Sequence, residues 1–113
     1  MVAIIDVSAL PASATAYRFE GRGYGEVPLS FFLVETPPGQ GPGLHTHPYA
    51  EVFVVQSGHG RFTIGEEAIE VCGGQIAIVP AGVPHAFTSL GPGLLRLIAM
   101  QPTAAIDTTW LVG

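Results

Sequence analysis

The chain has 113 residues, of which 48% are hydrophobic and only 12% are charged, against a usual charged share of about 25%. This length is typical of one domain, so we expect a single core built from residues 1–113. Nine acidic residues against four arginines and no lysine give a net charge of −5, which leaves no basic surface for phosphates and argues against a nucleic-acid partner.

The composition also predicts how the protein assembles and where it is located. Few charges are available to coat the surface of a monomer, so we expect a homodimer. Cys72 is the single cysteine, which excludes an internal disulfide and a thiolate metal site and fits a cytoplasmic protein. No apolar run has the length of a membrane-spanning helix, so we expect no membrane partner. We interpret the amino terminus as the start of the mature protein, because it has no basic start and Asp6 interrupts its apolar run.

Short segments rich in aromatic and β-branched residues alternate with turns made from fifteen glycines and ten prolines, a pattern typical of an all-β sandwich or barrel. The predicted strands are 16–20, 28–35, 43–47, 51–56, 60–64, 67–71, 75–80, 85–90 and 93–100. We expect tight hairpin turns at "IGEEA" and "QSGHGR", and a loop at the barrel mouth over 36–43. The runs "VFVV" and "IAIV" are apolar on both faces, which predicts strands covered on both sides.

Three residues with ligand-type side chains lie close together in "GLHTHPYAE". His45 and His47 are two positions apart, a spacing that places both on one face of a strand. Pro48 supports an extended chain, because the residue before proline avoids helical geometry. The two backbones would be about 6.5 Å apart, which allows both rings to reach one ion. Glu51 keeps the same parity and is the third predicted ligand.

The fourth ligand must come from another strand, and the remaining histidines are His59 and His85. His59 lies between two glycines in a predicted turn, where we expect its side chain to face water. His85 follows "IVPAGVP", in which an apolar strand stops at Pro80, turns at Gly82 and starts again. This is a rigid way to present a side chain inward, so His85 is the predicted fourth ligand.

Two segments resemble the two motifs of the cupin superfamily, in particular its small single-domain members. "GQGPGLHTHPYAEVFVVQSG" matches every position of the first motif, over 39–58, and "GGQIAIVPAGVPHAFTS" is similar to the second, over 74–89. One position departs, because Ser89 stands where the family has asparagine. That asparagine is not a metal ligand in the family, so the departure affects the surroundings of the ligands.

The resemblance implies a small antiparallel β-barrel of the jelly-roll type, a double-stranded β-helix, with a metal ion in its lumen. Three imidazoles and one carboxylate suit one divalent transition-metal ion, such as iron, manganese, nickel, copper or zinc. The alternative is a hydrogen-bonded polar cluster without an ion. Metal binding should weaken at acid pH, because imidazoles must be unprotonated to coordinate.

Tyr49 and Arg96 are the candidate catalytic residues outside the ligand set. Tyr49 shares the parity of the ligands, so its hydroxyl would serve the ion or the substrate, or its ring would only pack. Arg96 is the one charge in "LLRLIAM", so it either faces outward or points into the lumen to hold an anion. Cys72 is expected to be a small buried hydrophobe, and Trp110 either caps the barrel or contacts a partner subunit.

Three functions fit these features. The first is a metal-dependent enzyme of the dioxygenase or enolate-stabilising kind that acts on a small apolar or aromatic molecule. The second is a ligand-binding or sensing module that uses the same ion without turnover. A sugar isomerase or epimerase is a weaker third, because such sites use several polar side chains and this lumen is expected to be mainly hydrophobic.

Overall fold

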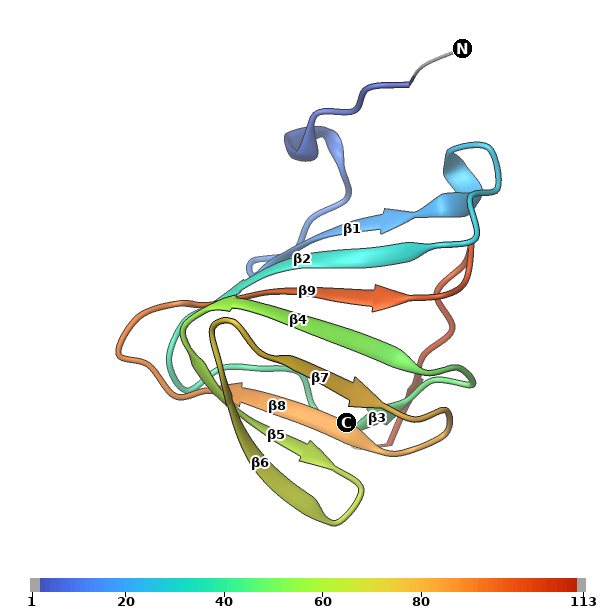
Figure 1. The fold of residues 1–113 in the computed structure, drawn as a ribbon. Helices are drawn as coiled ribbons and strands as arrows, with labels where there is room; N and C mark the ends of the chain where they lie inside the picture. Colours follow the sequence, from blue (N-terminus) through green and yellow to red (C-terminus); the bar gives the residue numbers. More distant parts are fainter. Residues whose placement is uncertain (1–2, 112–113) are drawn as a thin grey trace.

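The computed structural model describes residues 3–111, which fold into two antiparallel β-sheets that face each other (Figure 1). The first sheet has the strand order β1-β2-β9-β4-β7, and the second has the order β10-β3-β8-β5-β6. From β2 onward the chain passes from one sheet to the other after each strand except at the β5–β6 hairpin, as in a jelly roll. The predicted all-β class is confirmed. Within the described residues, no helix is long and apolar enough to cross a membrane.

The first sheet contains β1 (Ala16–Glu20), β2 (Ser30–Thr36), β9 (Leu95–Gln101), β4 (Glu51–Ser57) and β7 (Ile76–Val79). The second contains β10 (Thr109–Trp110), β3 (His45–Thr46), β8 (His85–Ser89), β5 (His59–Ile64) and β6 (Glu67–Cys72). Two single-turn 3₁₀ helices, η1 (Val7–Ala9) and η2 (Gly21–Gly23), flank β1. All nine predicted strands are present, and β10 is an addition that the sequence did not reveal.

The core lies between the sheets and is built by strict alternation along the strands. On β4, Phe53 and Val55 are buried, and on β9 Leu95, Leu97 and Ala99 are buried. These side chains meet a second group from the opposite sheet, namely Phe62, Val71 and Phe87. Edge-to-face contacts of Phe53 with Phe62 and Phe87, at centroid distances of 5.2 and 5.9 Å, are of the favoured aromatic type.

The two predicted hairpin turns have different outcomes. "IGEEA" is a hairpin, because β5 and β6 pair from Ile64 with Glu67 around Gly65 at φ 61°. "QSGHGR" is not, because β4 and β5 belong to different sheets. Gly58 there has φ 90°, and a Cβ would lie 2.3 Å from the Leu94 carbonyl oxygen, so glycine is required where the chain passes between sheets.

Candidate metal centre

Four polar side chains converge at one end of the space between the sheets. His45 belongs to β3, His47 follows that strand, Glu51 begins β4 and His85 begins β8. Their exposed fractions are between 2% and 7%. His45 lies directly opposite His85 in the β3–β8 register. One potential ligand atom from each of the four lies within 4.8 Å of all the others, so they form a group that could hold one divalent transition-metal ion.

The three imidazoles are held in an orientation suited to metal binding. The Nδ1 atoms of His45, His47 and His85 lie 2.7, 2.8 and 2.9 Å from backbone carbonyl oxygens, those of Gly43, Asp107 and Val83. Because a carbonyl oxygen only accepts, each Nδ1 carries the proton and donates it. The lone pair of each neutral ring is therefore on Nε2, and the backbone fixes the tautomer that a metal ligand needs.

Glu51 is the negative centre of this group. Its Oε1 lies 3.2 Å from Nε2 of His47 and 2.9 Å from Nε2 of His85. Burial acts to raise the pKa of Glu51, but hydrogen bonds from His47 and His85 and their charge, which these rings supply when no ion is bound and Nε2 also carries a proton, outweigh burial and lower this pKa to about 2. The carboxylate is therefore ionised at any physiological pH.

The pKa values of His45 and His47 are shifted in opposite directions. Burial lowers the pKa of His45 below its ordinary value of 6.5. Burial also acts to lower the pKa of His47, but the Glu51 carboxylate 3.2 Å from its Nε2 and the Asp107 carbonyl outweigh burial and raise this pKa. In the absence of an ion, His47 is thus protonated more readily than His45.

The chemistry of the group fits a metal ion. Nε2 of His47 is fully buried and has no properly aligned hydrogen-bond partner, although Glu51 is near. A buried nitrogen of this kind is costly unless it is satisfied. Two ligand atoms on one ion, each at about 2.1 Å, are at most about 4.2 Å apart, so small side-chain shifts bring all four donors within reach. Three nitrogens and one carboxylate oxygen are a donor set that transition metals accept.

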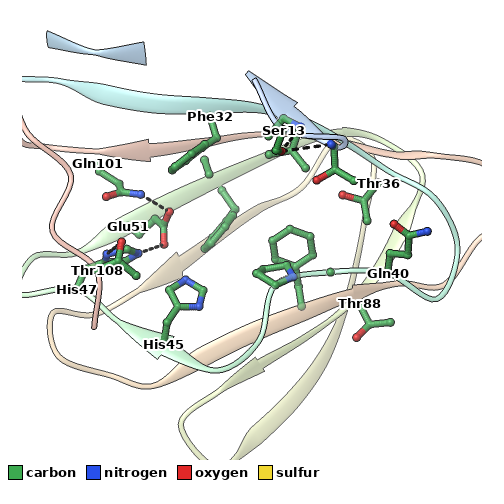
Figure 2. A pocket seen from close by; sticks show the side chains of 18 of the residues that line it. Ser13, Phe32, Thr36, Gln40, His45, His47, Glu51, Thr88, Gln101 and Thr108 are labelled. Atoms are coloured by element: carbon green, nitrogen blue, oxygen red, sulfur yellow. Dashed lines mark hydrogen bonds and ion pairs between the residues drawn. The ribbon is translucent and has the colours of Figure 1, made fainter. Parts of the chain in front are cut away.

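Gln101 and Tyr49 form a chain of hydrogen bonds that ends on Glu51. Gln101 is 1% exposed and donates from Nε2 to Glu51 Oε2 at 3.0 Å (Figure 2). The Tyr49 hydroxyl donates to Gln101 Oε1 and accepts from the Asp107 backbone N–H at 2.9 Å. The Tyr49 ring also stacks on His47, with centroids 5.3 Å apart. These contacts hold Oε2, so that Oε1 is the oxygen presented to the imidazoles.

Burial affects the acidity of Tyr49, and the residue lies outside the pocket wall. Burial raises the pKa of Tyr49 above its ordinary value of 10, so the hydroxyl remains protonated as a donor. Tyr49 is not among the residues that line the pocket. Its hydroxyl serves Gln101 and not the pocket directly.

A pocket of about 560 Å³ opens onto this group. His45, His47 and Glu51 form part of its wall, and Phe32, Phe53 and similar apolar side chains continue it between the sheets. Figure 2 shows the ligand group at one end and neutral polar side chains at the other, namely Ser13, Thr36, Gln40 and Thr88.

Trp110 extends the wall on the ligand side. Its ring centroid lies 4.8 Å from that of His45, and β10 pairs with β3 so that Trp110 lies opposite His45. Trp110 therefore covers part of the pocket in one chain, with 60% of its surface exposed.

The structure also places Arg96, Cys72 and His59, which the sequence analysis singled out. Arg96 lies on the outward side of β9 with its Nε 3.2 Å from Glu35 Oε2 and its side chain 56% exposed. The outward alternative for Arg96 is confirmed, and the hypothesis that it holds an anion in the lumen is wrong. Cys72 is exposed, so the prediction of a buried hydrophobe is also wrong, because it lies on the outward side of the edge strand β6. His59 is half-exposed beside Glu70, with Nε2 3.3 Å from Oε2.

Ser89, the residue that departs from the motif, is buried at the far end of β8 with an exposed fraction of 1%. Its backbone N–H donates to the Gln40 carbonyl at 2.8 Å and its carbonyl accepts from the Gly39 N–H at 2.7 Å. The Ser89 hydroxyl has no hydrogen-bond partner. The backbone of Ser89 thus anchors the loop over 36–43 at the pocket, and its side chain does not contact the ligand group.

Gln101 and the backbone of Asp107 are the functional groups that sequence reasoning missed. Gln101 was detectable, because it continues the inward parity of Leu95, Leu97 and Ala99 on one strand. A buried polar residue in that position needs a partner. The Asp107 carbonyl carries no signal in the sequence, since any residue supplies the same atom.

Residues 32–100 match the family described as the Cupin domain. This is more than half of the chain, so the chain belongs to the cupin family, as the two motifs indicated. A relative in Streptomyces coelicolor, described as an uncharacterized protein, is 38% identical over 56 residues, which are 50% of this chain and 53% of that protein. The similar region therefore covers about half the length of this relative.

Solved structures with the same fold include oxalate decarboxylase of Bacillus subtilis. A single-site variant of that enzyme has a TM-score of 0.78 and 21% identity, over 88% of this chain and 29% of that chain. Another structure of the enzyme, from work on its Mn(II) centres, has a TM-score of 0.80 and 21% identity, over 92% of this chain and 30% of that chain. At this identity the similarity shows the fold alone, and it covers less than a third of the larger enzyme.

Proposed function

We propose that this cupin is a metal-dependent enzyme that converts a small, largely apolar molecule in the pocket beside its ligand group. The observation that carries the proposal is that His45, His47 and Glu51 form part of the wall of a pocket of about 560 Å³. His45, His47, Glu51 and His85 are the proposed ligands of one ion of iron, manganese, nickel, copper or zinc. Such an ion supplies Lewis acidity or activates dioxygen.

The side chains around the ion have separate tasks in this proposal. The backbone carbonyls hold the Nδ1 protons, so that each Nε2 keeps its lone pair for the ion. Gln101 holds one oxygen of Glu51, which favours coordination through the other. Phe32, Phe53 and Phe87 exclude water from the neighbouring part of the pocket, where electrostatic interactions are stronger than in bulk water.

The charge of the pocket limits the substrate. Among the described residues that line it, the titratable side chains are those of His45, His47 and Glu51, and no arginine or lysine is present. A dicarboxylate would find no cationic side chain there. The pocket suits an uncharged or singly ionised molecule with an oxygen donor at one end and an apolar body.

The lack of a separate acid or base favours oxygen activation over enolate formation. Removing a proton from carbon needs a base within reach of the substrate. Glu51 is a weak base with a pKa of about 2, and Tyr49 is not part of the pocket wall. A substrate that arrives ionised or readily ionisable, such as a catechol or an enolised diketone, avoids this requirement.

The alternative is a ligand-binding or sensing module with the same ion. The same shortage of acid–base side chains supports it, because recognition without turnover needs none. A sugar isomerase or epimerase is less well supported, since it needs a proton-transfer group that the pocket wall does not offer.

Dioxygen consumption by the iron(II)-loaded protein, with a panel of catechols and β-diketones, distinguishes these functions. We expect uptake with the wild type and with Glu70→Gln, a matched change at an exposed carboxylate on β6, and none with Glu51→Gln. Uptake that persists in Glu51→Gln would contradict the assigned ligand. Binding of a panel compound by calorimetry without turnover, with any of the five metals, would favour the module.

The assembly and location that we propose are a homodimer in the cytoplasm. The low charge content supports the homodimer, and the single exposed thiol of Cys72 is compatible with a reducing compartment.

A further inference from the structure

The pocket beside the ligand group is long and narrow. Gln101 on β9 belongs to its wall where it donates to Glu51, and Thr36 on β2 belongs to its wall at the other end. In the β2–β9 register Gln101 lies opposite Ser30, six residues before Thr36, so these two levels are roughly 20 Å apart along the strand. A volume of about 560 Å³ over this length gives a mean cross-section of roughly 28 Å². The pocket is therefore a slot between the sheets.

The two ends of the slot differ in chemistry. We call the end beside the ligand group the metal end. The opposite end, which we call the far end, carries Ser13, Thr36, Gln40 and Thr88 (Figure 2). None of these side chains is charged. The wall between the two ends is apolar and includes Phe32, Val34, Phe53 and Phe87. A molecule that fills the slot therefore meets metal ligands, then an apolar stretch, then neutral hydrogen-bonding groups.

Thr36 is the buried polar residue of the far end. It is 2% exposed, and its side chain lies inward because it continues the alternation of Phe32 and Val34 on β2. The side-chain hydrogen bonds of the described residues include none of the Thr36 hydroxyl. The hydroxyl is also not one of the fully enclosed atoms without a partner, which are His47 Nε2 and Ser89 Oγ. It is therefore open to the pocket, and its partner has to come from there.

The far end is held in place before any ligand enters. The Ser89 N–H donates to the Gln40 carbonyl at 2.8 Å, which fixes the loop over 36–43 against β8. At Gly41 a Cβ would lie 1.8 Å from the Phe87 carbonyl oxygen, so the loop backbone is in direct contact with that strand. A preformed end of this kind binds a ligand without the cost of ordering a loop.

We propose that the far end binds an uncharged hydrogen-bonding group of the substrate, and that Thr36 is the residue that selects it. The substrate is then an elongated molecule with an oxygen donor at the metal end, an apolar body, and a hydroxyl, carbonyl or amide group roughly 15–20 Å away. This rests on the proposed function for the oxygen donor at the metal end. A terminal carboxylate or ammonium group finds no ionised partner at the far end, so burying it there is unfavourable.

Binding of linear β-diketones to the zinc-loaded protein tests the proposal without turnover. Each probe has the diketone at one end of an alkyl chain of about twelve bonds, which spans about 14 Å when extended. The other end carries a hydroxyl, methyl, carboxylate or ammonium group. Calorimetric titration measures the affinities. Trp110 is the single tryptophan, 4.8 Å from His45 between ring centroids, so a change in its fluorescence shows that the diketone occupies the metal end.

Thr36→Val separates the hydrogen bond from the apolar contacts. It should lower the affinity for the hydroxyl probe by about tenfold, the value of one ordinary hydrogen bond, and leave the affinity for the methyl probe within about twofold. In the wild type the hydroxyl probe should bind more tightly than either charged probe. The matched control is Thr63→Val, at a threonine that alternates with the buried Phe62 on β5, and it should bind all probes as the wild type does.

Two further measurements exclude a merely structural role of Thr36. A hydroxyl probe with a chain of about four bonds, about 5 Å long, does not reach Thr36 and should bind equally to the wild type and to Thr36→Val. In urea, Thr36→Val should be at least as stable as the wild type, because valine replaces a hydroxyl that has no partner within the chain. A clear loss of stability would show that the hydroxyl serves the fold, and the proposal would be wrong.

The outcomes separate this proposal from the proposed function. Equal effects of Thr36→Val on the hydroxyl and methyl probes, a wild type that prefers a charged probe, or a zinc-loaded protein that binds none of the probes would overturn it. A preference for the hydroxyl probe that Thr36→Val removes, in a protein that consumes no dioxygen, supports the far end and contradicts the enzyme alone. A wild type that does not bind zinc contradicts the proposed function, and the same comparison of probes on that protein still decides the role of Thr36.

Discussion

The two sides of the first sheet use the same strands for different purposes. On β4 and β9, the inward residues Glu51 and Gln101 are hydrogen-bonded to each other, and Glu51 Oε1 lies 3.2 and 2.9 Å from Nε2 of His47 and His85. The outward residues Val54 and Ile98 have no such neighbours and face an open surface. On the inner side the chain itself supplies all four potential ligands, whereas the outer side is an apolar surface on which Ile76 and Ile78 are exposed. Changes on one side should therefore leave the other side unaffected.

The largest loss of metal affinity is expected when a proposed metal ligand is replaced. His47→Ala and Glu51→Gln should each lower metal affinity by more than about 100-fold, since even outer partners of metal ligands contribute about 10–100-fold. Calorimetric titration with manganese or zinc measures this. His59→Ala, at a half-exposed histidine beside Glu70, is the control and should bind as the wild type does. Equal affinity in all variants would mean that the ion binds elsewhere.

Metal binding should change how the stability of the protein depends on pH. Without metal, the raised pKa of His47 contributes stability that is fully present below about pH 6.5 and lost as the pH rises through that pKa. The lowered pKa of Glu51 contributes stability above its ordinary pKa of 4.5, which is lost as the pH falls toward 2. With metal, stability should increase as the pH rises, because coordination needs neutral imidazoles.

Thermal unfolding between pH 5 and pH 8, with chelator and with excess zinc, measures both trends. The metal-free protein should show the smaller dependence on pH, because the lowered pKa of His45 and the raised pKa of His47 act in opposite directions over this range. The zinc-bound protein should unfold at higher temperature at the upper end of the range. Glu51→Gln should remove most of the difference between the two curves. Parallel curves for the two forms would show that the imidazoles do not bind the ion.

Removing the hydrogen bond from Gln101 to Glu51 should have an intermediate effect on metal affinity. Gln101→Leu removes the donor to Glu51 Oε2 and leaves the Tyr49 hydroxyl without its acceptor, so metal affinity should fall by about 10–100-fold. Gln56→Leu, on the exposed part of β4, is the matched control. An unchanged affinity in Gln101→Leu would mean that Glu51 does not need to be held.

Tyr49→Phe should have a smaller effect than Gln101→Leu. The ring remains stacked on His47, and Gln101 still donates to Glu51, so we expect a loss of less than about tenfold in metal affinity. Tyr24→Phe, at a ring that stacks on Phe19 outside the site, is the control. If Tyr49→Phe abolished turnover while metal affinity stayed normal, its hydroxyl would have a catalytic role and not only a positioning one.

The sequence predicts the site better than it predicts the surroundings. His45, His47, Glu51 and His85 were predictable because strand parity and motif spacing depend on covalent geometry. β10 was not, since two residues carry too little pattern and are defined by pairing with β3. The turn at Gly58 was misread as a hairpin because positive φ is common to hairpins and to passages between sheets. Which partner a strand takes depends on contacts distant in sequence.

The solvent exposure of side chains was also harder to predict than the alternation of inward and outward residues along the strands. The apolar runs of β4 and β7 predicted cover on both sides. On the outer side, however, Val52 and Val54 of β4 are only partly buried, and Ile76 and Ile78 of β7 are 63% and 62% exposed. Cys72 was expected inside because cysteine is usually buried, but its position on an edge strand places it outside. A sequence reports which surfaces need cover, and it does not report which molecule provides it.

The smallest effect is expected for Arg96→Gln, which tests the independence of the two sides directly. The Arg96 side chain is 56% exposed and paired with the equally exposed Glu35, and such surface pairs contribute about 0–1 kcal/mol. Metal affinity should stay within about twofold of the wild type, and unfolding free energy within about 0.5 kcal/mol. Calorimetric titration and urea unfolding measure these, with Arg61→Gln on β5 as the matched control. A tenfold loss of metal affinity in Arg96→Gln alone would show that a residue on the outer side acts on the inner site, and the two sides would then be coupled through β9.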